Sequence, residues 1–260
     1  AAFVARSASA VPLHLMTAKG LGPWTKTQPA RIKVMVDAAG FRGDTGKALL
    51  VHGAGGELES VLVGLGEGTD GFALASLPGS LPAGDYALTE IPGGLDGETL
   101  AIGWADGAYK FTRYKAGEKP RRLLLPKSVD AAEVSRQAEA IDWLRDLVNT
   151  PPCDLGPVEI AAEAQALAKE FGAEIEITTG KALESGYPMV HAVGKGAVQA
   201  PRYIEISWGK AKAPVIALVG KGVAFDTGGL NLKTSGMGLM KKDMGGAAHA
   251  LALARLIMSA

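Results

Sequence analysis

The sequence lacks the features that mark several large classes of protein. Its single cysteine, Cys153, cannot form an internal disulfide, so the chain is not a disulfide-bridged secreted scaffold. Its 27 basic and 27 acidic residues give no net charge, which argues against a surface for nucleic acid or for a membrane. No run approaches the roughly 18 consecutive apolar residues of a membrane-spanning helix. We therefore expect a cytoplasmic protein with no nucleic-acid or membrane partner.

The rest of the composition is that of an ordinary globular chain. With 260 residues, 47% of them hydrophobic, the chain can bury a core without metals or disulfides as staples, so a bound metal would serve chemistry. The first 16 residues are apolar, but Arg6, Pro12 and His14 make them a poor match to a signal peptide. We interpret this segment as the first strand.

The pattern of apolar residues predicts the α/β class. We expect a smaller N-terminal mixed α/β domain over residues 1–126, a connecting helix over 127–150, and a C-terminal α/β domain over 151–260 with a mostly parallel central sheet. In the first domain, short apolar runs between turn signals predict strands at 31–36, 48–51, 60–65, 86–88, 99–104, 110–114 and 122–125.

The connecting helix has start and stop signals. Asp130 with Glu133 forms a capping box, apolar residues then recur at spacings of three and four, and Pro151 with Pro152 ends the pattern.

The C-terminal domain is expected to alternate helices and strands. A helix should begin at Pro157 and stop at Gly172, and strands should follow at 173–179 and 203–208. The nearly continuous apolar run at 214–219 predicts a strand buried on both faces. The last helix should begin near Leu239.

The loop that follows the 214–219 run contains an unusual set of charged residues. Lys221, Asp226, Lys233 and Asp243 place two cations and two carboxylates on a glycine-rich loop that leads into a helix, and ligands of open α/β sheets bind beyond strand ends of this kind. Each residue alone also has an ordinary explanation, as a solvated lysine, a turn-capping aspartate or a charge that complements a helix dipole. A phosphate-binding loop is a further alternative, but the glycine spacing fits neither the P-loop nor the dinucleotide fingerprint.

Taken together, the strings VGKGVAFDTGGLNLK (219–233) and GLMKKDMGGAA (238–248) resemble the leucyl aminopeptidase family. The strings WLRDLVNTPPCDLGP, YPMVHAVGKG and APRYIEISWG upstream are similar to the same family, so the resemblance extends from Trp143 to the last residue. It implies a cytosolic metalloexopeptidase that releases N-terminal amino acids, leucine-like ones by preference, from peptide substrates. It also implies a homo-oligomer, a hexamer.

The resemblance assigns roles to five residues. Lys221, Asp226 and Asp243 become metal ligands, with Asp226 shared between two divalent ions, and Lys233 becomes the catalytic cation. Met240 lines the pocket for the first residue of the substrate. A lysine ligates a metal only as the neutral amine, which neighbouring dications favour. Oxygen and amine donors without cysteine suit zinc or manganese, and magnesium is a further alternative.

The chain departs from the family pattern in two places. The family's second ligand cluster, Asn-Thr-Asp-Ala-Glu-Gly-Arg, is absent; it provides a carboxylate ligand, a bridging glutamate and an arginine that holds bicarbonate as the proposed base. The loop between Lys233 and Asp243 is one residue shorter, within 234–238. We expect both departures to reflect a longer parent protein. The alternative is an inactive relative or fragment that serves as an assembly or binding module.

Overall fold

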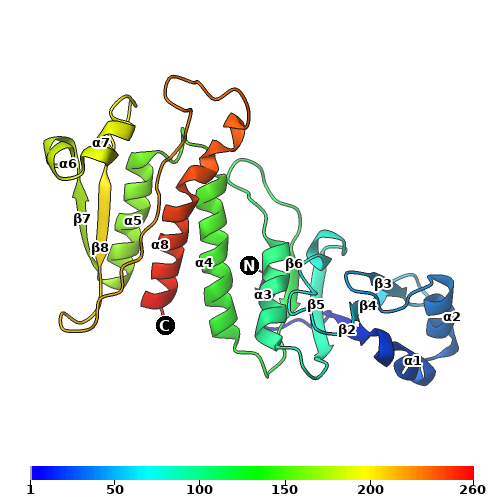
Figure 1. Cartoon of the computed structure of the whole chain (residues 1–260). Helices are drawn as coiled ribbons and strands as arrows, with labels where there is room; N and C mark the ends of the chain where they lie inside the picture. The colour runs from blue at the N-terminus through cyan, green and yellow to red at the C-terminus, as the bar shows by residue number, and fades with distance from the viewer. Residues whose placement is uncertain (1) are drawn as a thin grey trace. The chain divides into compact units, whose positions relative to one another are not determined.

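The computed structural model describes residues 2–260 and contains two compact units, residues 1–139 and 140–260. Figure 1 shows helices and strands in both, so the predicted α/β class is confirmed. No helix among the described residues is both long and apolar enough to cross a lipid bilayer.

The first unit is built on a six-stranded, mostly parallel sheet. Its strands are ordered β1-β6-β5-β2-β4-β3, and every neighbouring pair is parallel except β3 with β4 at one edge. The strands span β1 Phe3–Val4, β2 Val11–Thr17, β3 Ala48–His52, β4 Leu58–Gly66, β5 Gly84–Glu90 and β6 Arg121–Leu124. The apolar first residues therefore form two strands, where the sequence predicted one, because residues 5–10 leave the extended ladder.

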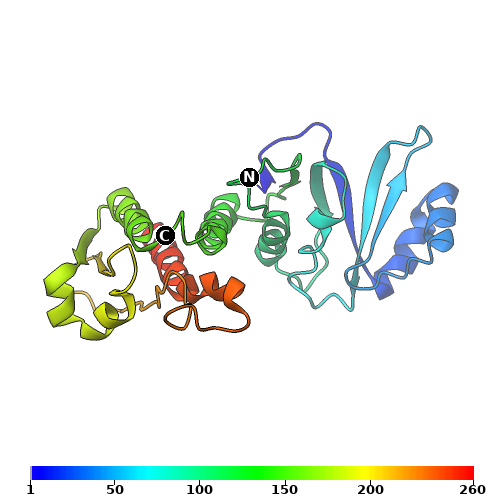
Figure 2. The same ribbon diagram turned by 90° about the horizontal axis from the view of Figure 1, so that it is seen from above.

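Helices cover both faces of this sheet. Alternate residues of β4 point to opposite sides, so that Val61 and Val63 join a core with Trp104 while Leu62 joins a separate core with Val36. The helices span α1 Ala18–Thr27, α2 Ala30–Ala38 and α3 Gly97–Ala108, with a short 3₁₀ turn, η1, at Leu77–Gly79. The first core includes Trp104 of α3, and the second includes Leu21 of α1 and Val36 of α2. Figure 2 shows α3 and the pair α1 and α2 on different sides of the sheet.

Three of the predicted strands in this unit are wrong. Residues 31–36 lie in α2 and residues 99–104 lie in α3, where Asp96 caps the first turn by accepting the Thr99 amide at 2.8 Å. A short apolar run is compatible with the periodicity of a helix and with that of a strand. Here tertiary packing favours the helix, because Ile32 and Val36, four residues apart, are both buried. Residues 110–114 form no strand.

Two long helices match their predicted signals. The Glu133 amide donates to the Asp130 carboxylate at 3.1 Å at the start of α4, Ala131–Asn149. The helix α5, Pro157–Phe171, ends at Gly172, which adopts the left-handed conformation at φ 64°. The remaining elements of the second unit are β7 Glu174–Thr178, α6 Gly180–Gly186, α7 Pro188–Gly194, β8 Tyr203–Ser207, η2 Met237–Met244 and α8 Gly245–Met258.

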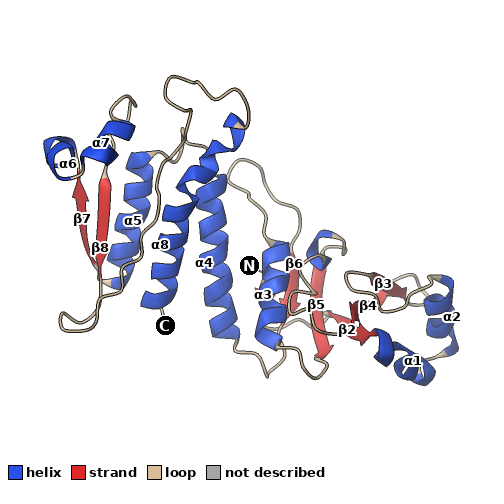
Figure 3. Ribbon diagram, in the orientation of Figure 1, coloured by secondary structure: helices blue, strands red, loops and turns tan. Residues whose placement is uncertain are grey.

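The second unit differs from expectation around its strands. The two strands β7 and β8 pair antiparallel, and α4, α5 and α8 share a core that includes Leu147, Ile160 and Met244. Figure 3 shows the whole stretch from β8 to η2 as loop. Residues 214–219, predicted as a buried strand, have no ladder partner among the described residues, and Val215 is 92% exposed. The last helix begins as the 3₁₀ helix η2 and becomes α-helical only at Gly245.

Candidate metal centre

The glycine-rich loop begins directly against the first turn of α8. The Ala247 amide donates to the Lys221 carbonyl at 2.9 Å. This close approach depends on glycines from both segments, because a Cβ added at Gly220 would lie 2.4 Å from the Gly246 carbonyl oxygen, and one at Gly246 would lie 2.8 Å from the Lys221 nitrogen. The backbone of Lys221 is therefore fixed next to the helix that follows Asp243.

A tight turn then brings Lys233 back to Asp226. The amides of Leu232 and Lys233 both donate to the Thr227 carbonyl, at 2.9 and 3.1 Å, and Asn231 adopts φ 59° within the turn. The Lys233 Nζ lies 2.8 Å from Asp226 Oδ2. The other carboxylate oxygen, Oδ1, accepts the amide of Gly228 at 2.8 Å.

Asp243 is the more shielded of the two carboxylates. Its side chain is 10% exposed, and Lys221 Nζ donates to its Oδ2 at 3.0 Å while Lys242 Nζ lies 3.6 Å from its Oδ1. The hydrogen bond from Lys233, followed by the Gly228 amide, lowers the pKa of Asp226, and a side-chain hydrogen bond with Asp243 contributes in the same direction. The two carboxylates are therefore neighbours.

Met240 completes the cluster, since its Sδ lies 3.1 Å from Lys233 Nζ. All five residues predicted for the site thus form one continuous series of contacts, from Lys221 through the two carboxylates to Lys233 and Met240. The structure brings them together, and the individual roles stay predictions.

The donor set can be tested against the chemistry of a divalent ion. Within residues 2–260 no three side chains of histidine, cysteine, aspartate or glutamate gather as a metal site. The cluster instead offers the carboxylates of Asp226 and Asp243 and the amine of Lys221. Oxygen and nitrogen donors suit zinc, manganese or magnesium, so the residues present fit part of a coordination shell.

Lys241 was missed at the sequence level. It is 9% exposed, and its Nζ donates to the carbonyl oxygen of Leu147 at 2.7 Å. Burial lowers the pKa of Lys241 to about 8. The available signal was a lysine three residues before the buried Met244, on the apolar side of a helix. The hydrogen bond joins Lys241 to Leu147, 94 residues apart in the sequence, so no local sequence pattern predicts it.

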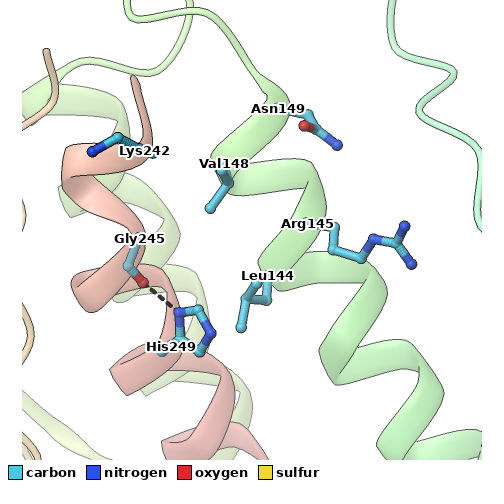
Figure 4. Close-up of a pocket in the computed structure, with 7 residues that line it drawn as sticks. All are labelled: Leu144, Arg145, Val148, Asn149, Lys242, Gly245 and His249. Carbon is cyan, nitrogen blue, oxygen red and sulfur yellow. Dashed lines mark hydrogen bonds between the residues drawn. The ribbon is translucent and has the colours of Figure 1, made fainter. Parts of the chain in front are cut away.

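A separate cleft of about 360 Å³ opens between α4 and α8, and none of the five predicted site residues lines it. Figure 4 shows Leu144, Val148 and His249 facing each other across it, while Arg145 and Asn149 extend away from α8. The Nδ1 of His249 donates to the Gly245 carbonyl at 2.7 Å.

Comparisons with known proteins cover nearly the whole chain. Residues 142–260 match the catalytic domain of the cytosol aminopeptidase family, and residues 11–126 match the N-terminal domain of M17 aminopeptidases. A probable cytosol aminopeptidase from Rhodococcus jostii is 40% identical over a gapped alignment of 178 positions, which covers 61% of this chain and 35% of that protein. One from Streptomyces coelicolor is 31% identical over a gapped alignment of 275 positions, which covers 87% of this chain and 52% of that protein.

Solved structures agree with the sequence matches. The crystal structure of a cytosol aminopeptidase from Coxiella burnetii superposes with a TM-score of 0.89 at 38% identity, covering 97% of this chain and 56% of that chain. The bottromycin maturation enzyme BotP in complex with Mn gives a TM-score of 0.77 at 27% identity, again over 97% and 56%. The chain thus spans about half the length of the proteins it matches. On the matched domains, the shared fold and the loop sequence, the chain belongs to the cytosol aminopeptidase family.

Proposed function

We propose that the protein to which this chain belongs is a metal-dependent aminopeptidase that releases N-terminal residues, with a leucine-like preference, from peptides. The observation that supports this best is the convergence of Lys221, Asp226, Lys233 and Asp243, brought from both ends of a 23-residue segment into one cluster of ion pairs. Because the chain spans 56% of the Coxiella protein, the activity is proposed for the full-length protein.

Three residues would hold the metal ions. Lys221, Asp226 and Asp243 would act as ligands of a two-ion centre of zinc or manganese, and the BotP complex with Mn supports manganese as one of the candidates. When bound, the ions would supply an acidified water and a polarised peptide carbonyl. Lys221 would have to lose its proton, which the approach of dications favours. The bicarbonate base implied by the family resemblance stays a prediction.

The two other residues would act on the substrate directly. The ammonium of Lys233 would stabilise the negative charge that develops on the carbonyl oxygen in the transition state. Met240 lies against that ammonium, with its sulfur 3.1 Å away, so an apolar pocket for the first side chain would begin beside the catalytic cation. This arrangement supports a preference for apolar N-terminal residues.

The cellular location and the oligomeric state of the enzyme are proposed from its relatives and its family resemblance. Relatives named cytosol aminopeptidases support a cytoplasmic location, and the family resemblance supports a hexamer acting on peptides. Light scattering on the purified full-length protein would measure the mass of the particle directly, and a monomer would contradict the proposed assembly.

The activity is tested with the full-length protein after its metal has been removed. Hydrolysis of leucine p-nitroanilide should appear when Mn²⁺ or Zn²⁺ is added and disappear with a chelator, and Asp226→Asn should abolish it. An acidic residue in the same unit but outside the cluster, Glu184, provides the matched control as Glu184→Gln. Metal binding without hydrolysis of any aminoacyl substrate would favour the alternative, a binding or assembly module.

A further inference from the structure

The 3₁₀ helix η2 sorts its side chains into three rows. A 3₁₀ helix has three residues per turn, so residues i and i+3 lie on the same side. Met240 and Asp243 form the row that faces the metal cluster. Leu239 and Lys242 form an exposed row, and Lys241 and Met244 form a row that faces the core of the second unit. A charged lysine is therefore placed where an apolar residue is expected.

The partner of Lys241 explains this placement. In an α-helix the carbonyl of Leu147 would accept the amide of the residue four positions later, but that residue is Pro151, which has no amide hydrogen. The Lys241 ammonium donates to this carbonyl at 2.7 Å instead. A cation is also favoured near a helix C-terminus, where the helix dipole is negative. Lys241 thus takes the place of the missing backbone hydrogen bond at the end of α4.

The bond has a geometric consequence for the metal cluster. Because Lys241 lies between Met240 and Asp243, fixing its side chain against α4 fixes the rotation of η2 about its own axis. Met244, fully buried in the same row, secures the second point. If the row of Lys241 turned away from the core, the row of Asp243 would turn away from Lys221.

We propose that Lys241 is a positioning residue of the metal centre: its buried ammonium, bonded to the Leu147 carbonyl, sets the rotation of η2 and so holds Asp243 and Met240 toward Lys221 and Lys233. The inference rests on the proposed metal centre, but it is measured without peptide hydrolysis. The competing role is purely structural, in which Lys241 only caps α4.

The test compares variants of the full-length protein by calorimetric titration with Mn²⁺ and by hydrogen exchange. Lys241→Met keeps the apolar stem and removes the ammonium; it should weaken Mn²⁺ binding by about 10- to 100-fold, the usual effect of losing a group that orients a ligand. Exchange should rise in 237–244 while β7 and β8 keep their protection. Lys181→Met, which removes an exposed lysine of α6, should retain wild-type affinity.

A double variant separates positioning from capping. Lys241→Met should also raise exchange at the end of α4, because the Leu147 carbonyl loses its partner. Adding Pro151→Ala gives this carbonyl an amide again, so protection at the end of α4 should return while Mn²⁺ affinity stays low. Recovery of both would overturn the proposal, as would an unchanged Mn²⁺ affinity in Lys241→Met. If Lys241→Met does not fold, Lys241→Leu, which also lacks a donor for the Leu147 carbonyl, faces the same two criteria. A wild-type protein that binds Mn²⁺ but hydrolyses no peptide would refute the proposed function and leave this test intact.

Discussion

The charged residues of the cluster differ in how far solvent reaches them. Asp243 is shielded, whereas its partner Lys221 has a side chain that is 59% exposed, and the pair of Asp226 and Lys233 is intermediate. A shielded carboxylate interacts more strongly with a nearby cation than an exposed one does, because water screens it less. Replacing Asp243 should therefore weaken metal binding more than replacing either of the other proposed ligands, Lys221 or Asp226.

Replacing Asp243 by alanine is expected to lower the metal content of the purified full-length protein, because its ion would lose one oxygen ligand. Elemental analysis measures the content directly. Glu184→Ala, in the same unit, should bind as much metal as the wild type. Equal metal in Asp243→Ala and wild type would refute the ligand assignment.

Replacing Lys233 by alanine is expected to leave metal content unchanged and to lower kcat by about 100- to 1,000-fold, the typical effect of removing one group that stabilises an oxyanion. Steady-state kinetics on leucine p-nitroanilide measure kcat and KM separately. A raised KM with an unchanged kcat would indicate instead that Lys233 only binds the ground state of the substrate. Lys210→Ala, on the exposed loop after β8, serves as the control.

At the scale of elements, the sequence was most informative where local signals agreed. The helices α4 and α5 have caps, a continuous apolar spacing and a proline or glycine at their ends, and both formed as predicted. The runs in α2 and α3 were too short for their period to be distinguished, and neighbours distant in sequence decided between helix and strand.

The candidate site, too, was predictable from the sequence only in part. Its five predicted residues lie in one segment whose sequence is characteristic, so the resemblance to a family could find them. The contacts that hold the segment in place involve ordinary residues, a pair of glycines and the carbonyl of Leu147, which no pattern along the chain connects to the loop. Packing between segments that are distant in the chain could therefore not be predicted from the sequence.

The contact between the loop and α8 gives a prediction at this scale. Gly246→Ala places a methyl group 2.8 Å from the Lys221 nitrogen, so the two segments must separate, at a cost of about 1 to 3 kcal/mol in the free energy of unfolding. Mn²⁺ affinity should fall as well, because Lys221 moves relative to Asp243. Urea denaturation and calorimetric titration measure the two effects.

Gly245→Ala is the matched control, since a Cβ there meets nothing within 4 Å and the residue has helical φ. It should stabilise α8 by up to about 1 kcal/mol. If the two variants behave alike, the close approach does not constrain the site.

At the scale of the whole molecule, each unit has its own core. A change that destabilises one unit should therefore leave the stability of the other unchanged. Asp85 of β5 and Arg122 of β6 form a bidentate ion pair in the first unit, with distances of 2.7 and 3.0 Å. The hydrogen bonds from Arg122, and then one from Ser7, lower the pKa of the Asp85 carboxyl. The pair therefore joins neighbouring strands in a charge-dependent way.

Because the folded pKa of Asp85 is depressed, its stabilisation is complete above the unfolded value of about 3.9 and is lost as pH falls through the folded value. Asp85→Asn should lower the stability of the first unit at pH 7 by up to about 1 kcal/mol, and the difference from wild type should shrink below pH 4. Urea denaturation at pH 7 and pH 3 checks this, with Glu67→Gln as the exposed control. A difference independent of pH would point to packing rather than charge.

The three rows of η2 also set rules for how this segment can change length during evolution. Residues 234–236 are exposed loop, so a residue gained or lost there alters only the approach to the helix. The range in which the chain was expected to be one residue shorter than its family, 234–238, contains this loop and the first two residues of η2. A single insertion between Met237 and Asp243 would instead turn everything after it by about 120°. An insertion before Lys241 would move Asp243 into the row that faces the core, and it would move Lys241 into the exposed row, away from the Leu147 carbonyl. Insertions and deletions among relatives should accordingly collect before Met237, and any tolerated within the helix should come in threes.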